Sequence, residues 1–392
     1  MVRQRVRRAR LPAALGIVLL VAACGPAPAS APAGAPAGGA GAGGAAGEAA
    51  AAAPADAPAG WEETVAAAKQ EGTLVLSGPP GQLWRDGLLL FEKDYPGIKV
   101  ELTGQNSRDY WPRVFQERAA GQYLWDLRVG GPDPQVFQAR DGGALDPVRP
   151  LLVLPEVTDE SKWFGGFDGL YADAAKQYLP AFIAQSSPTA YVNRGVVSEA
   201  DLSSDRQLVE PRWRGKIAIA DPAGGAGLGT LTTLLAAYGE DYVQDLLSKQ
   251  DLAVTGDNRQ LAEWVVRGRY PIGIGVTDDE LLLFQQQGLT FDVRGLGGAR
   301  KLSLGFGGIQ LMNRAPHPNA AKVFANWLLT RDTQARLAPL VEFNSRRTDV
   351  PPVSPADALD PSHLQDYVPH QYEELLPTRQ RAQQLGKDLL AK

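Results

Sequence analysis

From residue 73 onward, short apolar segments alternate with segments of helical periodicity, and this alternation constrains the fold more than any other feature. Strand patterns cover 73–78, 98–103 and 124–129, and helical patterns cover 82–94 and 107–120. Strands that alternate with helices predict βαβ units, in which helices cover both faces of a mainly parallel sheet. Ligands of such sheets bind beyond the carboxyl ends of the strands.

The same alternation resumes in the second half of the chain. A strand is expected over 216–220, followed by a glycine-rich stretch over 221–227 and a helix over 228–238. Another strand over 271–276 runs into Thr277-Asp278-Asp279 and a helix that ends at Gln287. A body of about 330 residues is long enough for two domains of ordinary size, so two α/β units are expected.

The first 60 residues are expected to lie outside the folded body. Five arginines precede an apolar run over 11–21, which is shorter than the roughly 20 residues of a membrane span and indicates a signal peptide over 1–23. The small residues before Cys24 resemble a bacterial lipobox, so we expect Cys24, the only cysteine, to be lipidated. Residues 24–60 are almost entirely Ala, Gly and Pro, which predicts a disordered tether.

Charge and residue counts exclude several classes of function. The chain carries a formal charge of −5, and loss of the five arginines in residues 1–23 changes this to −10. An acidic body argues against nucleic acid as a partner. With one cysteine and three scattered histidines, the sequence indicates neither disulfides nor a metal site, and no cofactor is expected.

An extracytoplasmic hydrolase is the competing class of function. The sequence contains neither a G-x-S-x-G elbow nor an H-E-x-x-H zinc motif. Asp278 and Asp279 are adjacent at an expected helix start, where they point in different directions and make a poor acid/base pair. The chain is therefore not expected to be an enzyme. A lipoprotein that senses a ligand without transporting it stays open, because sensing and transport use the same binding step.

Several motifs, taken in order, resemble those of type 2 periplasmic binding proteins that serve ABC importers. The stretch 91–100, FEKDYPGIKV, is similar to the second strand of that family, and 211–222, PRWRGKIAIADP, to a segment of its second half. The resemblance covers residues 61–350. It implies two lobes that close over a small molecule and deliver it to an ABC permease. The members most similar in general appearance bind ferric iron, thiamine or phosphonates.

The resemblance implies an α/β, two-lobed type 2 periplasmic-binding-protein fold with crossing hinge strands. Lobe I is expected over 61–187 together with 305–392, and lobe II over 188–304. The crossing strands are expected near 189–193 and 302–311, where glycines would permit a hinge. The protein is expected to be a monomer, held by its lipid anchor on the extracytoplasmic face of the cell membrane.

Loops that follow the expected strands, or flank the crossing, predict the ligand site. Backbone amides and hydroxyls dominate these loops, which favours an oxygen-rich, anionic small molecule, and Trp84 is placed to stack on it. The predicted ligand-binding residues are Ser77, Gly78, Gln82, Trp84, Gly131, Asp133, Ser186, Ser187, Gly225, Gly227, Thr277 and Asp278.

Other ligands stay as alternatives. Iron binders of the family carry a tyrosine pair after the strand that 271–276 resembles, and here that position reads Thr277-Asp278-Asp279. Carboxylates also suit hard cations, so ferric iron remains an alternative. The acidic pair could equally face a polyamine, or stabilise the positive end of the helix that follows.

Two further motifs each allow two interpretations. The glycine run over 224–229 lacks the Gly-Lys-Ser/Thr ending of a P-loop, so it is either an anion cradle at a helix start or a tight turn. Arg346-Arg347 could pair with a ligand carboxylate or phosphate, or form a surface salt bridge.

Overall fold

Three β-sheets organise the part of the chain that the computed structural model describes, residues 56–355 and 358–390. The first sheet has the order β2 (Lys99–Gly104), β1 (Thr73–Gly78), β3 (Leu127–Val129), β12 (Ile309–Met312) and β4 (Leu145–Asp146). The second has the order β10 (Val293–Gly295), β6 (Ala190–Asn193), β9 (Ile272–Ile274), β7 (Ile217–Ala220) and β8 (Ala253–Thr255). A central sheet has the order β13 (Asn344–Ser345), β5 (Ile183–Pro188), β11 (Arg300–Ser303) and β14 (Tyr367–Val368).

The first sheet confirms the βαβ prediction. β1 pairs with β2 and β3 in parallel, and its register runs from Thr73 opposite Lys99 to Gly78 opposite Gly104. β12 returns from late in the chain and pairs antiparallel with β3, with Ile309 opposite Val129. The associated helices are α1 (Trp61–Glu71), α2 (Gln82–Leu88), α3 (Leu90–Asp94), α4 (Ser107–Ala119), α5 (Pro134–Asp141), α6 (Pro155–Thr158), α7 (Gly166–Gly169), α12 (Pro318–Leu329) and α13 (Arg331–Val341).

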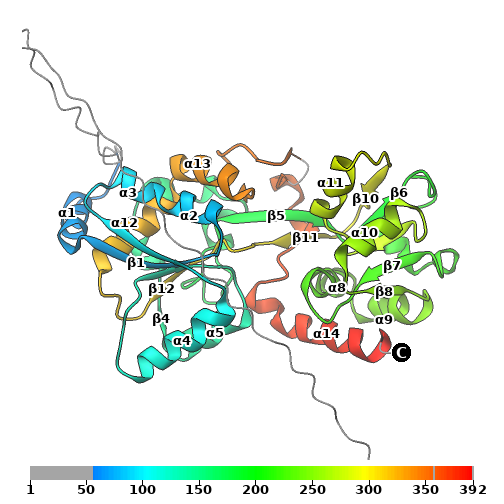
Figure 1. Cartoon of the computed structure of the whole chain (residues 1–392), viewed down its shortest axis with the longest axis horizontal. Coiled ribbons are helices and arrows are strands. Elements are labelled where there is room, and N and C mark those ends of the chain that lie inside the picture. The colour runs from blue at the N-terminus through cyan, green and yellow to red at the C-terminus, as the bar shows by residue number, and fades with distance from the viewer. Residues whose placement is uncertain (1–55, 356–357, 391–392) are drawn as a thin grey trace, which may run out of the picture. The chain divides into compact units, whose positions relative to one another are not determined.

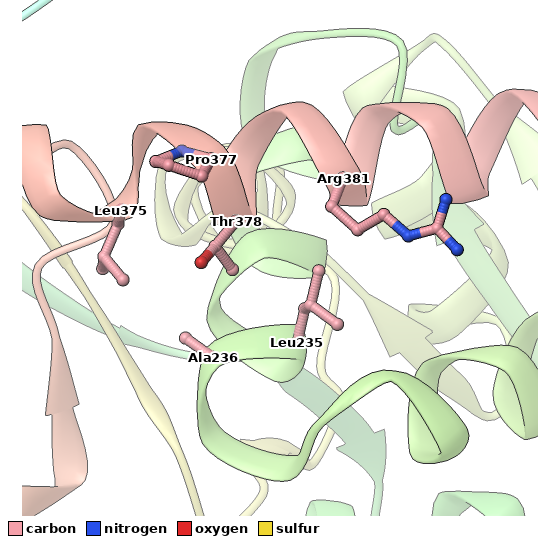
Figure 2. A pocket seen from close by; sticks show the side chains of 6 residues that line it. All are labelled: Leu235, Ala236, Leu375, Pro377, Thr378 and Arg381. Carbon is pink, nitrogen blue, oxygen red and sulfur yellow. The ribbon is translucent and has the colours of Figure 1, made fainter.

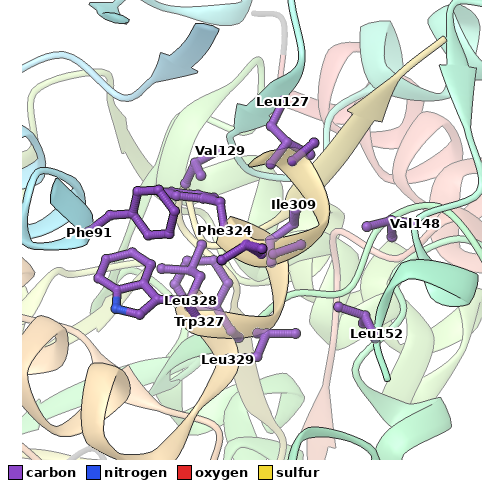
Figure 3. Packing of buried hydrophobic residues seen from close by; sticks show 14 of the residues in the cluster. Phe91, Leu127, Val129, Val148, Leu152, Ile309, Phe324, Trp327, Leu328 and Leu329 are labelled. Atoms are coloured by element: carbon purple, nitrogen blue, oxygen red, sulfur yellow. The ribbon is translucent and has the colours of Figure 1, made fainter. Parts of the chain in front are cut away.

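An aromatic cluster ties distant segments into the first core. The Phe91 ring lies 5.1 Å from that of Phe324 and 5.2 Å from that of Trp327, in both cases edge to face. Figure 3 shows these rings beside Leu127 of β3 and Ile309 of β12. The core therefore needs both ends of the body, because α3 and α12 come from opposite halves of the sequence.

The second sheet is covered by α8 (Gly225–Tyr238), α9 (Glu240–Lys249), α10 (Asn258–Val266), α11 (Asp278–Gln286) and α14 (Leu376–Leu390). The last of these helices, α14, packs against α8 and α9, as Figure 1 shows, and Leu385 belongs to the same buried cluster as Ile217. The expected assignment of 305–392 to lobe I therefore does not describe α14, which we assign to lobe II. The other lobe boundaries stay as proposed.

The central sheet joins the two outer sheets (Figure 1). β5 and β11 are antiparallel, with Ser187 opposite Lys301. These two strands make the crossing, slightly earlier in the chain than the expected 189–193 and 302–311. The segment 190–193 is already part of the second sheet, because β6 pairs with β9 and β10.

Several expected elements differ in their bounds. The helix expected over 82–94 breaks at Leu89 into α2 and α3. The strand expected over 124–129 is three residues long, at Leu127–Val129. Predictions for residues 1–55, including the signal peptide, Cys24 and most of the tether, lie outside the described residues. Among the helices that the structure describes, none combines the length and apolar character needed to cross a membrane.

Candidate functional site

A cavity of about 370 Å³ lies where the central sheet meets both lobes. β5 and β11 supply one wall, the start of α11 another, and the end of α13 a third. Its volume falls within the usual range for small-molecule sites. The lining residues are Gln185, Ser187, Val276, Thr277, Asp278, Asp279, Lys301, Ser303, Val341, Glu342 and Phe343.

The start of α11 gives the cavity an acidic wall. Asp278 and Asp279 lie in the first turn, where the helix dipole favours carboxylates. Asp278 accepts a hydrogen bond from the Tyr191 hydroxyl. Thr277 occupies the N-cap without a capping bond, and its buried hydroxyl oxygen has no hydrogen-bond partner within 56–355 and 358–390. This wall therefore presents two carboxylates to a ligand, beside a buried hydroxyl that makes no hydrogen bond within the described residues.

Lys301 of β11 lines the same cavity. Its side chain makes no hydrogen bond or salt bridge with any residue that the structure describes. Burial lowers the pKa of Lys301, while the nearby Asp278 and Asp279 carboxylates act to raise it. Sequence reasoning missed this residue, although a lysine that alternates with leucines in 301–304 was a usable signal.

Glu342 brings a carboxylate to the cavity from the first-lobe side. It follows α13 directly, is exposed, and has a φ of 59°. That left-handed conformation costs an L-residue other than glycine about 1–2 kcal/mol. Sequence reasoning missed Glu342 as well, because its position depends on where α13 ends.

Two predicted ligand residues of the first lobe are occupied within the protein. Ser77 is fully buried, and its Oγ accepts a hydrogen bond of 2.9 Å from Arg128 Nη1. Asp133 caps α5, accepting bonds of 2.8 and 3.0 Å from the amides of Gln135 and Val136. Neither side chain lines the cavity.

The residues predicted around the β1–α2 loop also lie away from the cavity. Gly78 ends β1, and Gln82 is exposed and bonds Asp86 at 2.6 Å. The Trp84 side chain is only 6% exposed, belongs to the first core and meets Phe306 edge to face. Trp84 packs in the first core and does not line this cavity, so its stacking role stays a prediction that the cavity does not support.

On the crossing strand, alternation separates two neighbouring serines. Ser187 lines the cavity, whereas Ser186 is fully buried and accepts a 2.7 Å bond from Arg300 Nε. Successive side chains of a strand point to opposite faces, so only one of the two could reach the site. Thr277, Asp278 and Ser187 are thus the three predicted residues that the structure brings together.

The predicted glycines serve close backbone packing. A Cβ on Gly131 would lie 1.9 Å from the carbonyl oxygen of Gly305, and one on Gly227 would lie 2.3 Å from that of Asp221. Gly225 is exposed in the first turn of α8 and, like the other two, is not in the cavity wall. For the glycine run, these contacts favour the tight-turn reading.

Arg346 and Arg347 are both buried, so the surface salt-bridge reading is wrong. Arg347 does pair with a carboxylate bidentately, but the partner is Asp349, with Nε–Oδ1 and Nη2–Oδ2 distances of 2.8 and 2.9 Å. Arg346 donates to backbone carbonyls and to the Tyr372 hydroxyl. Both guanidinium groups hold the fold together.

A second hollow, of about 500 Å³, lies between α8 and α14. Figure 2 shows its lining of Leu235, Ala236, Leu375, Pro377, Thr378 and Arg381. Arg381 is paired with Glu240, with a distance of 2.8 Å from Nε to Oε2. This lining lacks the converging polar groups that fix a small solute, so the cavity beside α11 is the better site.

No group of three or more His, Cys, Asp or Glu side chains is arranged to hold a metal ion anywhere in the described ranges. The acidic residues around the cavity come from two separate walls: α11 supplies Asp278 and Asp279, and the end of α13 supplies Glu342. In this arrangement the cavity is acidic on two sides without being a formed metal centre.

Comparison with known proteins adds relatives of similar architecture. Iron uptake protein A2 of Synechocystis is 24% identical over 306 residues, covering 69% of this chain and 81% of the relative. The Trichodesmium protein IdiA (FutA), solved with iron and citrate ligands, matches with a TM-score of 0.60 and 15% identity, covering 82% of this chain and all of that one. AfuA from Actinobacillus pleuropneumoniae, solved with fructose-6-phosphate, matches with a TM-score of 0.52 and 20% identity, over 82% and 99% of the two chains.

These structural matches confirm the two-lobed α/β binding-protein fold. The bacterial extracellular solute-binding protein profile matches residues 77–335, which is more than half of the chain. The family is non-enzymatic, in agreement with the expectation from the missing catalytic motifs. The chain is therefore a member of the bacterial extracellular solute-binding protein family.

Proposed function

We propose that this protein captures a cationic solute in the cavity beside α11 and delivers it to an ABC importer, with ferric iron as the first candidate. The acidic lining carries this proposal: Asp278, Asp279 and Glu342 outnumber the single lysine of the cavity. Carboxylate oxygens are hard ligands that suit a trivalent cation. This lining weighs against the anionic solute expected from the sequence.

The relatives support iron without deciding it. The Synechocystis relative is named an iron uptake protein, and the Trichodesmium structure holds iron and citrate. AfuA has the same fold and holds a sugar phosphate, so the fold is compatible with more than one class of solute. The choice therefore rests on the residues of the cavity.

A polyamine is the second candidate. The position after β9 carries Thr277-Asp278-Asp279 in place of a tyrosine pair, and the described carboxylates do not form a metal-ligand group. Separate carboxylates on two walls suit a solute with amino groups spaced along a chain.

Calorimetry on the full-length protein in mild detergent would test the proposal, with ferric citrate, spermidine, a phosphonate and a dicarboxylate as probes. Ferric citrate or spermidine should bind, and the Asp278→Asn/Asp279→Asn double variant should lose most of that affinity. Asp245→Asn is the matched control, because the Asp245 side chain is 45% exposed and lies outside the cavity wall, where it pairs with Lys249. Exclusive binding of the phosphonate or dicarboxylate, unaffected by the double variant, would contradict a cationic cargo.

Delivery and anchoring are separate parts of the proposal. We propose that Cys24 carries a lipid that holds the protein, as a monomer, on the extracytoplasmic face of the membrane. Cys24→Ala should move the protein from the membrane to the soluble fraction. A transport role predicts that cells lacking the protein lose uptake of the bound solute. Normal uptake in those cells would favour the sensor alternative instead.

A further inference from the structure

Lys301 lines the cavity without a hydrogen bond or salt bridge to any residue of 56–355 or 358–390. Its strand neighbours in the central sheet are Ser187 on β5 and Val368 on β14. α8 covers its methylene stem, since a Cβ on Gly229 would lie 3.4 Å from Lys301 Cδ. A buried ammonium group without a hydrogen-bonded counter-ion is costly, so the protonation of this lysine depends on the charges around it.

Those surrounding charges are mainly negative and belong to the proposed solute site. α11 presents Asp278 and Asp279, and the residue after α13 presents Glu342 to the same cavity. On another side lies His370, whose pKa falls to about 3 through burial and the Lys301 and Arg379 charges, so His370 is neutral near pH 7. Arg300, on the same strand as Lys301, is bonded to Ser186.

We propose that Lys301 exchanges its proton for the cationic solute: a cation that settles beside Asp278 and Asp279 causes the ammonium group to release one proton to solvent, leaving the neutral amine. This inference rests on the proposed function, because it needs a cationic cargo. The net charge inside the cavity then rises by one unit less than the charge of the solute, because one proton leaves as the solute arrives.

The electrostatic reason follows from what holds the proton in the empty cavity. Burial lowers the pKa of Lys301, and Asp278 and Asp279 counteract that effect. A bound cation neutralises these carboxylates and adds its own repulsion, so the Lys301 pKa falls further. By linkage, solute affinity rises with pH, by up to about tenfold per pH unit across the range where Lys301 titrates.

Proton release on binding is measurable by calorimetry in buffers with different ionisation enthalpies, using ferric citrate and spermidine on the full-length protein. Wild type should release one more proton per bound cation than Lys301→Met, and the variant should lose the pH slope and bind more tightly at low pH. Lys301→Arg, which stays charged, should also lose the slope but bind more weakly. Lys249→Met, at an exposed lysine, is the control and should behave as wild type.

Two outcomes would overturn the exchange. Equal proton release from wild type and Lys301→Met shows that another group supplies the proton. Weaker binding of both probes by Lys301→Met shows that the lysine contacts an anionic part of the solute directly.

If neither probe binds wild type, the proposed function fails, and the empty protein still tests the coupling. The Nζ resonance of Lys301, identified in ¹⁵N-lysine-labelled protein by its loss in Lys301→Met, should titrate at lower pH in Asp278→Asn/Asp279→Asn. An unchanged titration midpoint would refute the coupling between Lys301 and these carboxylates, whatever the cargo.

Discussion

Two clusters of polar residues occupy equivalent positions in the two lobes and are used differently. The first strand-end cluster is Ser77 near the end of β1, Arg128 within β3, and Asp133, which follows β3. The second strand-end cluster is Thr277, Asp278 and Asp279, which follow β9. In the first, the Ser77 hydroxyl and the Asp133 carboxylate are hydrogen-bonded to neighbouring residues. In the second, all three residues line a cavity. A strand-end position is therefore insufficient to identify a ligand residue.

Arg128 accounts for most of the difference. Arg128 is 2% exposed, and its guanidinium bonds Ser77 and Ser107, each at 2.9 Å, with the Tyr110 ring 4.5 Å away. Among the described residues, no arginine bonds to the second cluster, and Lys301 lines the same cavity and is affected by the Asp278 and Asp279 charges. The first cluster should thus control stability, and the second should control binding and the response to pH.

The largest expected effect concerns His370, which lies beside Lys301. It tests whether the surroundings of the second cluster control the response of the protein to pH. The His370 pKa of about 3 lies below the value of about 6.5 in the unfolded chain. The folded state therefore binds fewer protons, and the stabilisation present above pH 6.5 is lost as the pH falls towards 3. Between neutral pH and pH 4.5, this histidine should lower the free energy of unfolding of the wild type by about 3 kcal/mol. His370→Asn should abolish that loss, measured by urea unfolding at both pH values.

His363 provides the control for that measurement. It is exposed, and its bond to Asp360 raises its pKa, so its small contribution is present below pH 6.5 and is lost as the pH rises. His363→Asn should leave the loss of stability at acid pH unchanged. If both variants reduced the pH dependence of the unfolding free energy equally, the acid sensitivity would not come from the surroundings of Lys301.

Ser77→Ala would test whether the first cluster is structural. The change leaves Arg128 Nη1 without its buried acceptor, which should cost about 2 kcal/mol in the free energy of unfolding. Solute affinity should stay at the wild-type value. A loss of affinity without a loss of stability would return Ser77 to the ligand site and erase the distinction between the clusters.

Asp133→Ala should have a smaller effect of the same kind. Loss of the α5 cap costs about 1 kcal/mol, again with unchanged affinity. Asp133→Ser, which keeps a capping oxygen, should recover most of the stability. Failure of serine to do so would mean that the charge of Asp133, felt by Arg128, matters more than the cap.

Glu342→Gly should give the smallest change in stability and, unlike the preceding variants, should stabilise the protein. Glycine relieves the left-handed strain at a φ of 59°, so stability should rise by about 1 kcal/mol or less, while loss of the carboxylate weakens cation binding. Asp251→Gly, at a φ of 53° and outside the cavity wall, should give the same stabilisation with unchanged affinity. Unaltered affinity in Glu342→Gly would remove the first lobe from the solute site.

Local pattern predicted the fold well where each element is specified by its own residues. The bounds of β1 match the expected strand, because the run 73–78 is apolar and a Pro-Pro-Gly turn follows it. The family resemblance predicted the two lobes. It did not predict that α14 packs on α8, because the apolar face of that helix fits either lobe until the path of the chain is known.

The site was harder to predict, because it depends on which side chains meet across the sheets. Ser77 could not be excluded without knowing that Arg128, on a different strand, reaches it. Lys301 and Glu342 enter the cavity from β11 and from the end of α13. The pattern of 301–304 was a usable signal for Lys301, whereas the position of Glu342 depends on where α13 ends. Thr277 and Asp278 were found because they directly follow a strand of the second sheet.

The position of β12 in the first sheet has a consequence for how the protein folds. Ile309 pairs with Val129, and the whole second sheet lies between them in the sequence. The first lobe therefore cannot complete its sheet until the chain has emerged past residue 312. Contacts between such distant residues slow folding. Late completion of a sheet is useful to an extracellular protein, because a chain that has not finished folding can still pass through a translocation channel.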